Sequence, residues 1–307
     1  MTSYRRREFL AKLSRYLAGA ATIPPLLHIS PSMLGAEKPP SLLTHGKGED
    51  YAALLERVLK PFGGMKSFVK PGQTVVVKPN IGWDRTPEQA ANTNPHVVEA
   101  VVRSALSAGA KSVKVFDRTC NDERYTYKRS GIKDAVQGID SAKVQCSYID
   151  KRKFTPVRIK KGRDIKEWRF YRDALEADVY INLPIAKDHG LANLTLGLKN
   201  IMGIIGGDRG RIHQNIGQRL ADLNTVIRPA LTIIDASRIL TDNGPRGGSQ
   251  RDVEKLDTLI AAVDPVAADA FATTLFDRKI DDVSSTVAAH AMGLGEKNLR
   301  KLEIEKV

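Results

Sequence analysis

The feature that most constrains the fold is a strand, a helix and a second strand in close succession. Thr74–Lys78 is a short β-branched run, which predicts a buried strand. Asn94 and Pro95 then provide an N-cap and a first-turn proline for a helix that runs to Ala108. Ser112–Phe116 is the next apolar run and predicts the second strand. Two strands joined by a helix form a βαβ unit, so we expect a sheet that is at least partly parallel.

Apolar patterning along the rest of the chain predicts further elements of both kinds. Expected helices span residues 51–59, 132–136, 194–202, 220–227, 266–276 and 283–292. Expected strands span residues 143–149, 154–160, 165–171, 179–183, 231–235, 259–263 and 302–307, the last as an edge strand. We therefore predict an α/β fold with a mixed, largely parallel sheet flanked by helices and a β-hairpin insertion around residues 150–172.

The first 36 residues predict an export signal. Arg6 and Arg7, followed by Glu8 and then Phe9-Leu10, resemble the twin-arginine (Tat) signal of bacteria. The alternative is an amphipathic, Arg-rich helix of a cytosolic protein. The signal predicts the Tat translocase as a partner and a periplasmic or extracellular location, and it leaves open whether and where the leader is cleaved. Residues 37–50 are expected to form a linker. Residues 51–307 are expected to form a single α/β domain, either undivided or in two lobes at 51–177 and 178–307.

Charge and cysteine content narrow the classes of partner. The 307-residue chain carries a formal net charge of +13, which favours anionic partners. Its densest basic patch, residues 151–163, lacks interleaved aromatic residues, and nucleic acid is not an expected partner of an exported protein. Beyond the leader no apolar run is long enough to predict a stable membrane span. Cys120 and Cys146 are the only cysteines and form no C-x-x-C pair, so no iron–sulfur cluster is expected, whereas a disulfide between them is one alternative to two free thiols.

Polar residues follow several expected strands at the point where each strand ends. They are Lys78 with Asn80, Asp117, Asp235 and Asp264. Ligands of open α/β sheets bind outside the carboxyl ends of the strands, so these residues predict a shared site with lysines and carboxylates. The alternative is that each is a turn residue or a helix cap.

The strongest local signal is the segment from Lys187 to Gly203. Lys187 and His189 are expected on a loop, and Thr195, Lys199 and Asn200 on the helix that follows it. Thr195 and Lys199 are four residues apart and would share one face of that helix. A histidine beside a lysine near a helix start suits an anion, a general base or a metal. The alternative is a packed helix with a solvent-facing lysine.

A glycine-rich segment follows this one. In Gly206-Gly207-Asp208-Arg209-Gly210-Arg211, the glycines allow backbone amides to approach a ligand. Arg209 and Arg211 suit a carboxylate or a phosphate. The segment lacks the Gly-Lys-Ser/Thr ending of a Walker A loop, and no strand feeds it as in a dinucleotide fingerprint. A flexible, exposed loop is the alternative.

Apart from this glycine-rich segment, the motifs described above resemble the domain of unknown function 362 family. The specific part is Lys187-x-His189 followed by Lys199-Asn200-x-x-Gly203, and the resemblance covers most of residues 70–280. It implies the core of the fold without implying an activity. Several members of the family also carry a ferredoxin-like module with cysteine-rich motifs, from which this chain departs.

We expect an exported protein that binds a small anionic ligand, with enzymatic activity undecided. The expected catalytic residues are His189, as the acid–base group, with Lys187 and Lys199. The expected ligand-binding residues are Lys78, Asn80, Thr195, Asn200, Arg209 and Arg211. The cofactor is open: a divalent metal would be held by Asp235 and Asp264, or by His189 with Asp117 or either of these two. The alternative function is a non-catalytic accessory partner of a periplasmic redox system.

Overall fold

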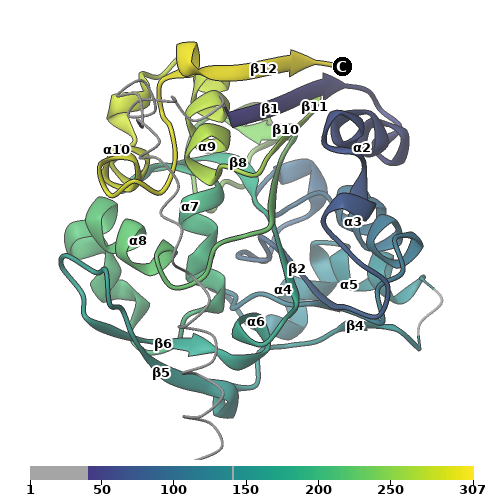
Figure 1. The fold of residues 1–307 in the computed structure, drawn as a ribbon, viewed down its shortest axis with the longest axis horizontal. Helices are drawn as coiled ribbons and strands as arrows, with labels where there is room; N and C mark the ends of the chain where they lie inside the picture. The colour runs from purple at the N-terminus through teal and green to yellow at the C-terminus, as the bar shows by residue number, and fades with distance from the viewer. Residues whose placement is uncertain (1–40, 140–141) are drawn as a thin grey trace, which may run out of the picture. The chain divides into compact units, whose positions relative to one another are not determined.

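The structure is a computed structural model that describes residues 41–139 and 142–307, so the predicted export signal lies outside the described residues. Figure 1 shows the order of the elements. The helices are α2 (Tyr51–Leu59), α3 (Pro95–Ser107), α4 (Glu123–Arg129), α5 (Ile132–Gln137), α6 (Arg172–Leu175), α7 (Gly197–Asn200), α8 (Ile216–Asn224), α9 (Pro265–Thr273) and α10 (Ser284–Ala291). The strands are β1 (Ser41–Lys47), β2 (Thr74–Pro79), β3 (Ser112–Val115), β4 (Val144–Cys146), β5 (Phe154–Arg158), β6 (Glu167–Tyr171), β7 (Val179–Leu183), β8 (Ile185–His189), β9 (Asn193–Thr195), β10 (Leu231–Leu240), β11 (Val253–Ala262) and β12 (Leu302–Lys306).

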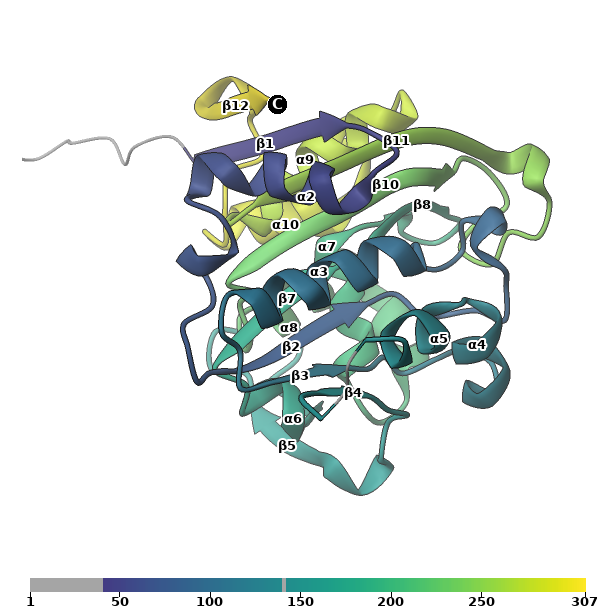
Figure 2. The ribbon, with the colours of Figure 1, turned by 90° about the vertical axis from the view of Figure 1, so that its right-hand side faces the viewer.

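One ten-stranded sheet organises these elements. Its main path runs β12-β1-β11-β10-β7-β2-β3-β4, and β8 leaves the path to pair with β10 and β9. Neighbours from β10 to β4 are parallel, whereas β11 is antiparallel to both β1 and β10. Helices α2 and α3 cover one face of this sheet, and α7, α8, α9 and α10 cover the other (Figure 2). The predicted mixed, largely parallel α/β fold is confirmed.

The central βαβ unit forms as the sequence predicts. Val75 and Val77 pack in the core beneath α3, whereas Val76 faces the core on the other side of the sheet. A strand that is buried on both faces needs apolar residues at every position, which explains the unbroken β-branched run. The Asn94 side chain accepts the backbone N–H of His96 and so caps α3.

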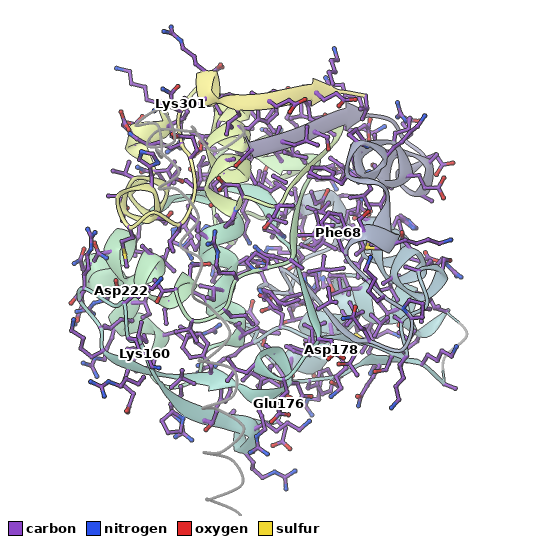
Figure 3. All side chains as sticks on the ribbon, viewed as in Figure 1. Phe68, Lys160, Glu176, Asp178, Asp222 and Lys301 are labelled. Carbon is purple, nitrogen blue, oxygen red and sulfur yellow. The ribbon has the colours of Figure 1, made fainter. Side chains whose placement is uncertain are left out.

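One carboxylate holds the turn of the β5–β6 hairpin against the body of the protein. Asp222 on α8 accepts the backbone N–H groups of Arg163, Asp164 and Ile165, at the turn of the hairpin. Figure 3 labels Asp222 beside this turn and Lys160 close to it. The predicted hairpin insertion is therefore confirmed. Its apolar side chains belong to a core cluster that packs against the sheet.

The predicted linker is wrong over the part that the structure describes. Ser41–Lys47 is strand β1, which pairs with β11 on one side and with the predicted edge strand β12 on the other. Leu43 is fully buried, and the Thr44 hydroxyl donates to the Val58 carbonyl oxygen. The prolines and glycines that flank this segment suggested a loop, but pairing on both sides satisfies its backbone groups.

The helix predicted over residues 194–202 is also wrong in its first half. Residues 185–195 form a short antiparallel hairpin of β8 and β9, and the helix α7 begins only at Gly197. Lys187 therefore lies on a strand directly opposite Thr195, instead of on a loop. Pairing of β8 with β10 determines this outcome, because short apolar runs do not separate strand from helix by periodicity alone.

Two predicted strand ends are misplaced. Asp235 lies within β10, which continues to Leu240. Asp264 follows β11, and β11 runs antiparallel to β10 with Ala262 opposite Thr232 near the start of that strand. The carboxyl end of β11 therefore lies at the opposite edge of the sheet from the carboxyl ends of β2 and β3. The expectation that all these ends converge fails for Asp264, because it assumed that every strand runs in the same direction.

Candidate anion-binding site

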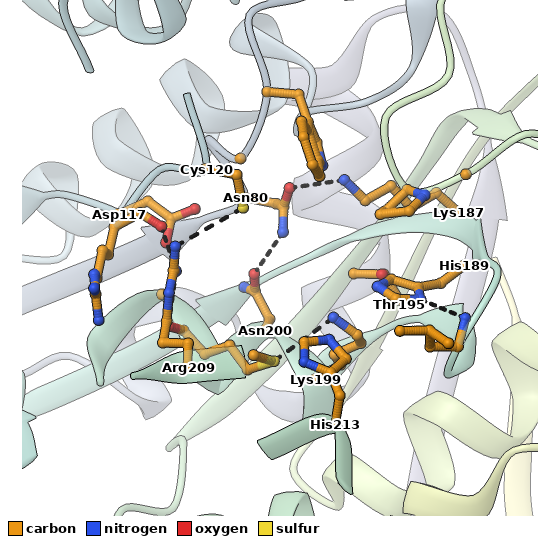
Figure 4. Close-up of a pocket in the computed structure, with 18 of the residues that line it drawn as sticks. Asn80, Asp117, Cys120, Lys187, His189, Thr195, Lys199, Asn200, Arg209 and His213 are labelled. Atoms are coloured by element: carbon orange, nitrogen blue, oxygen red, sulfur yellow. Dashed lines mark hydrogen bonds between the residues drawn. The ribbon is translucent and has the colours of Figure 1, made fainter. Parts of the chain in front are cut away.

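A cavity of about 520 Å³ lies at the carboxyl ends of β2 and β3, beside β8, β9 and α7 (Figure 4). Its volume falls in the range of small-molecule sites. Eight of the predicted site residues line it together: Lys78, Asn80, Lys187, His189, Thr195, Lys199, Asn200 and Arg209. Three others, Arg211, Asp235 and Asp264, are not among its lining residues.

A buried ion pair forms one wall. The Lys78 ammonium lies 2.9 Å from Asp117 Oδ1, and the two side chains are only 1% and 3% exposed. Asp117 Oδ2 accepts the backbone N–H of Ile81, which fixes the carboxylate. Gly203 packs directly over the pair, and a Cβ at this position would lie 1.6 Å from Asp117 Oδ1 and 2.4 Å from Lys78 Nζ. Glycine is therefore required at this position of the Lys-Asn-x-x-Gly motif, because the ion pair leaves no room for a Cβ atom.

Two asparagine amides connect this ion pair to Lys187. Asn200 Oδ1 accepts from Lys78 Nζ at 2.6 Å and from Asn80 Nδ2 at 3.2 Å. Asn200 Nδ2 donates to the Lys78 carbonyl oxygen and to Asn182 Oδ1. Asn80 Oδ1 in turn accepts from Lys187 Nζ at 3.1 Å. Both amides are thus occupied by protein groups, and their place in the site is to position the lysines.

Lys187 is buried without a carboxylate partner in the described part of the chain. Its side chain is 1% exposed, and Nζ donates to the Ala91 carbonyl oxygen at 2.5 Å and to Asn80. Desolvation by burial lowers the pKa of Lys187 to about 7, and the charge of Lys199 lowers it further while Cys120 opposes the shift. An anion that enters the cavity would raise this pKa again, because it stabilises the charged form.

Lys199 makes even fewer contacts. Its Nζ has one hydrogen-bond partner among the described residues, the thioether sulfur of Met202 at 3.6 Å. Desolvation lowers the pKa of Lys199 to about 8, and the nearby cations Arg209 and Lys78 contribute in the same direction. Because a thioether is a weak acceptor, the donor hydrogens of Lys199 are left to a ligand.

His189 is held as a neutral donor. Its Nδ1 accepts the backbone N–H groups of Leu191 and Ala192, at 3.1 and 3.2 Å. Desolvation, followed by the charges of Lys199 and Lys187, lowers the pKa of His189 to about 3. The ring is therefore neutral near pH 7, and the proton sits on Nε2. In this tautomer Nε2 donates to a ligand and offers no lone pair to a metal.

Two arginines complete the rim. Arg209 donates to the carbonyl oxygens of Arg118, Met202 and Thr119. Arg118 donates to the carbonyl oxygens of Ile205 and Gly207. Both guanidinium groups connect loops through these hydrogen bonds. Asp117 is the one carboxylate among the described lining residues, and it already pairs with Lys78. The positive charge of the two arginines therefore remains uncompensated in the cavity. Arg211, by contrast, lies in a separate surface depression.

The balance of charge and polarity defines what the cavity suits. Its described lining holds five cationic side chains against one carboxylate, Asp117, which already pairs with Lys78. The hydroxyl oxygen of Thr195 is buried and has no hydrogen-bond partner among the described residues. Trp83, Leu191 and Met202 add apolar surface. Converging donors with little acceptor capacity suit a small anion with several oxygen atoms.

The two aspartates proposed as metal ligands have other partners. Asp235 is fully buried and accepts the backbone N–H groups of Asn94 and Ser237. Asp264 caps α9 through Val266 and Ala267. Within residues 41–139 and 142–307 there is no group of three or more His, Cys, Asp or Glu side chains placed to hold a metal ion. Asp264 matches the helix-cap alternative, whereas Asp235 lies within β10 and is neither a turn residue nor a helix cap.

Sequence reasoning missed part of the cavity. Trp83 and Cys120 line it, although neither belongs to the motifs that drew attention. Their position in the sequence could have identified them, because both lie a few residues beyond the strand ends that carry Lys78 and Asp117. Cys120 and Cys146 are both free thiols, so the disulfide alternative is not formed.

Comparison with known sequences identifies the family. The profile of DUF362, a domain of unknown function, matches residues 75–274. The chain belongs to the DUF362 family. This confirms the resemblance predicted from the Lys187-x-His189 and Lys199-Asn200-x-x-Gly203 motifs. A thylakoid-associated protein of Synechocystis sp. is 30% identical over 251 residues, which cover 79% of this chain and 75% of that protein.

Two solved structures resemble the fold. One is the lactate racemase apoprotein from Thermoanaerobacterium thermosaccharolyticum, with a TM-score of 0.47, 13% identity, and coverage of 79% of this chain and 58% of that one. The other is a protein from Thermotoga maritima, with a TM-score of 0.43, 11% identity, and coverage of 80% and 60%. This chain therefore spans less than two thirds of either solved protein, and neither likeness bears on what it binds.

The described residues also bear on membrane contact in one respect. Among them, no helix combines the length and the apolar character needed to cross a bilayer.

Proposed function

We propose that this DUF362 protein is an exported protein that binds a small anion with several oxygen atoms in the cavity at the carboxyl ends of β2 and β3. The observation that carries the proposal is the pair Lys187 and Lys199. Both amines line one cavity, and neither forms an ion pair with a carboxylate in the described part of the chain. Keeping two such lysines in a desolvated site is costly unless a ligand provides the opposite charge.

The chemistry of the lining supports a carboxylate or a phosphate as the charged group of the ligand. Lys187 and Lys199 provide the positive charge, and His189 provides a neutral N–H donor. The apolar surface of Trp83 and Leu191 at the same cavity suits a ligand that also carries a small carbon skeleton.

Titration calorimetry tests this proposal. We expect phosphate or a small carboxylate such as succinate to bind the wild-type protein. Lys199→Met and Lys187→Met should each weaken binding about tenfold to a hundredfold, because a hydrogen bond to a charged group contributes roughly 1.5–3 kcal/mol. Lys301→Met is the matched control, because Lys301 is an exposed lysine outside the cavity.

The alternative function predicts a different result. A non-catalytic partner of a periplasmic redox system would not need the cavity and would bind none of the anions. Among the described residues, the large exposed apolar side chains are Tyr125, Leu191, Val263 and Ile304, which come from four separate segments. This distribution does not favour a docking patch.

Loss of anion binding in Lys301→Met, or equal binding in all the variants, would contradict the proposed site.

His189→Ala separates a functional histidine from a structural one. We expect it to keep the unfolding temperature close to that of wild type and to weaken anion binding, because Nε2 is the only ring nitrogen left to a ligand. His96→Ala is the control, since His96 is exposed on α3. If His189→Ala unfolds the protein instead, the histidine serves the β8–β9 turn.

Export is the second part of the proposal. Its support is the Arg6-Arg7-Glu8-Phe9-Leu10 motif together with the thylakoid-associated relative. Replacing Arg6 and Arg7 by lysine should leave the protein in the cytoplasmic fraction of a Tat-competent bacterium. Replacing Lys12 by arginine, which keeps the twin arginine, should not. Equal fractionation of both variants and wild type would contradict Tat export.

A further inference from the structure

We propose that Lys199 is a nucleophile that forms an imine with the carbonyl carbon of a small 2-oxo acid bound in the cavity. The inference rests on the proposed function and names the class of anion as one that carries a carboxylate next to a ketone or aldehyde. Such a molecule matches a site with separate groups for a negative charge, for a carbonyl oxygen and for a reacting amine.

The contacts of Lys199 distinguish it from the other lysines of the cavity. The Lys78 ammonium is held by Asp117 and Asn200. The Lys187 amine donates to the Ala91 carbonyl oxygen and to Asn80. Lys199 has only the Met202 sulfur as a hydrogen-bond partner among the described residues, and its side chain is partly exposed to the cavity. It is therefore the amine with the fewest constraints on reaching a carbonyl carbon.

The surroundings of Lys199 keep a useful fraction of the amine uncharged. Desolvation and the neighbouring cations lower its pKa to about 8. An unprotonated lysine amine has the lone pair that attack on a carbonyl requires, and enzymes that form imines obtain it by this combination of burial and nearby positive charge. Lys187, whose amine is held by two oxygen acceptors, is placed to meet the carboxylate of the ligand.

Two further groups are available for the carbonyl oxygen. The Thr195 hydroxyl is 3% exposed, lines the cavity and has no hydrogen-bond partner among the described residues. His189 offers its Nε2–H, because Nδ1 accepts two backbone N–H groups. Donors aimed at an oxygen that gains negative charge stabilise the addition step.

The chemical step balances without an oxidant or a reductant. The Lys199 nitrogen attacks the carbonyl carbon, and the carbonyl oxygen takes up a proton as the C–N bond forms. The nitrogen releases a proton, and the carbinolamine then loses its hydroxyl group as water when a proton is returned. This leaves a protonated imine, whose nitrogen releases its remaining proton. One amine and one ketone thus give one imine and one water.

Reductive trapping tests the inference. The full-length protein is incubated with glyoxylate, pyruvate or 2-oxoglutarate, reduced with cyanoborohydride and analysed by intact mass spectrometry and peptide mapping. We expect one adduct per chain, with the mass of the oxo acid less one oxygen atom, on the peptide that contains Lys199. Lys199→Met should abolish this adduct, whereas Lys301→Met should leave it unchanged.

The outcomes separate this inference from the proposed function. Adducts spread over surface lysines, or an adduct that survives Lys199→Met, overturn the assignment of the nucleophile. Absence of any adduct while phosphate still binds the cavity overturns imine chemistry and leaves anion binding in place. Absence of both overturns the two proposals together. If Lys199→Met does not fold, the position of the adduct in the wild-type peptide map decides the question.

The pH profile of trapping provides an independent readout. The rate at Lys199 should rise as the pH passes about 8 and then level off, because the amine is fully unprotonated above that value. Residual labelling of an exposed lysine such as Lys301 should keep rising toward the ordinary lysine pKa. Parallel profiles for the two positions would contradict a specially activated amine.

Discussion

At the scale of single residues, the site depends on two desolvated lysines that have no carboxylate partner among the described residues. Lys187 and Lys199 have pKa values lowered to about 7 and about 8, so both lose charge within an accessible pH range. We expect the affinity for phosphate to fall as the pH rises through these values, because the uncharged amines no longer attract the anion. Calorimetry across this range checks the prediction, and an affinity that stays constant would contradict it.

The same shifts predict the pH dependence of stability without ligand. Between about 7 and the ordinary lysine value of 10.5, the unfolded chain binds more protons at Lys187 than the folded chain does. The free energy of unfolding should therefore rise with pH in this window, and the cost of burying the charge is fully present only below it. Urea unfolding of wild type and Lys187→Met measures the difference. A rise of equal size in the variant would assign the effect to other groups.

Gly203 is the residue whose replacement should be most damaging. A methyl group there would overlap Asp117 and the Lys78 amine, so Gly203→Ala must separate the ion pair. We expect the free energy of unfolding to fall by about 3–5 kcal/mol, the usual cost of breaking a buried pair. Gly190→Ala is the control, because nothing lies within 4 Å of a Cβ at that position and its φ is not positive. Equal stability of the two variants in thermal unfolding would contradict the packing described.

Residue patterns predicted the cations of the site better than their partners. Lys187, His189 and Lys199 follow from one motif, and the structure brings them to one cavity. The roles of Asn80 and Asn200 did not follow, because hydrogen bonds between positions 120 residues apart depend on the folded sheet. Local sequence shows which side chains carry charge, but not which of them will meet.

At the scale of elements, α7 places Lys199 because a carboxylate on α9 holds its first turn. Asp269 accepts the backbone N–H groups of Gly197 and Leu198. Asp269→Ala should lower stability by about 0.5–2 kcal/mol, as the loss of a helix cap does, and should also weaken anion binding.

A second cap is the matched control. Asp264→Ala removes the cap of α9 at the other edge of the sheet, so it should lower stability and leave anion affinity unchanged. Calorimetry and thermal unfolding on both variants check the pair. Equal loss of affinity in the two would mean that stability alone, instead of the position of α7, controls binding.

Elements with a clear local pattern were predictable, and those fixed by distant pairing were not. The strand β2, the helix α3 with its Asn94 cap and the β5–β6 hairpin match the sequence closely. The strand β1 and the β8–β9 hairpin were missed, since β11, β12 and β10 supply the partners that make them strands. Their identity is decided by the rest of the sheet.

At the scale of the whole molecule, the direction of the strands decides which residues share a site. The parallel strands deliver Lys78, Asp117 and the segment after β7 to one edge, while the antiparallel β11 delivers Asp264 to the other. The fold class followed from one βαβ unit, but strand direction at β11 did not. The two predicted metal ligands, Asp235 and Asp264, therefore do not meet at the cavity, whereas the lysines predicted for the anion site do.

Removal of metal ions tests whether the cavity binds its anion without a metal. Dialysis against a chelator should leave both the unfolding temperature and the anion affinity unchanged, because the cavity lining is rich in cations and the His189 tautomer offers no lone pair at Nε2. Readdition of zinc or magnesium is the control. A fall in unfolding temperature on chelation, reversed by one of these metals, would contradict a site that binds its anion without metal.

The most direct measurement is anomalous diffraction from crystals of the protein grown with selenate, a tetrahedral dianion whose selenium can be located. The account predicts a selenium peak within the cavity, with selenate oxygens at hydrogen-bond distance from Lys187 Nζ, Lys199 Nζ and His189 Nε2. It also predicts that phosphate displaces this peak. Selenium peaks confined to surface lysines, with an empty cavity at the same selenate concentration, would contradict the claim that this cavity is an anion site.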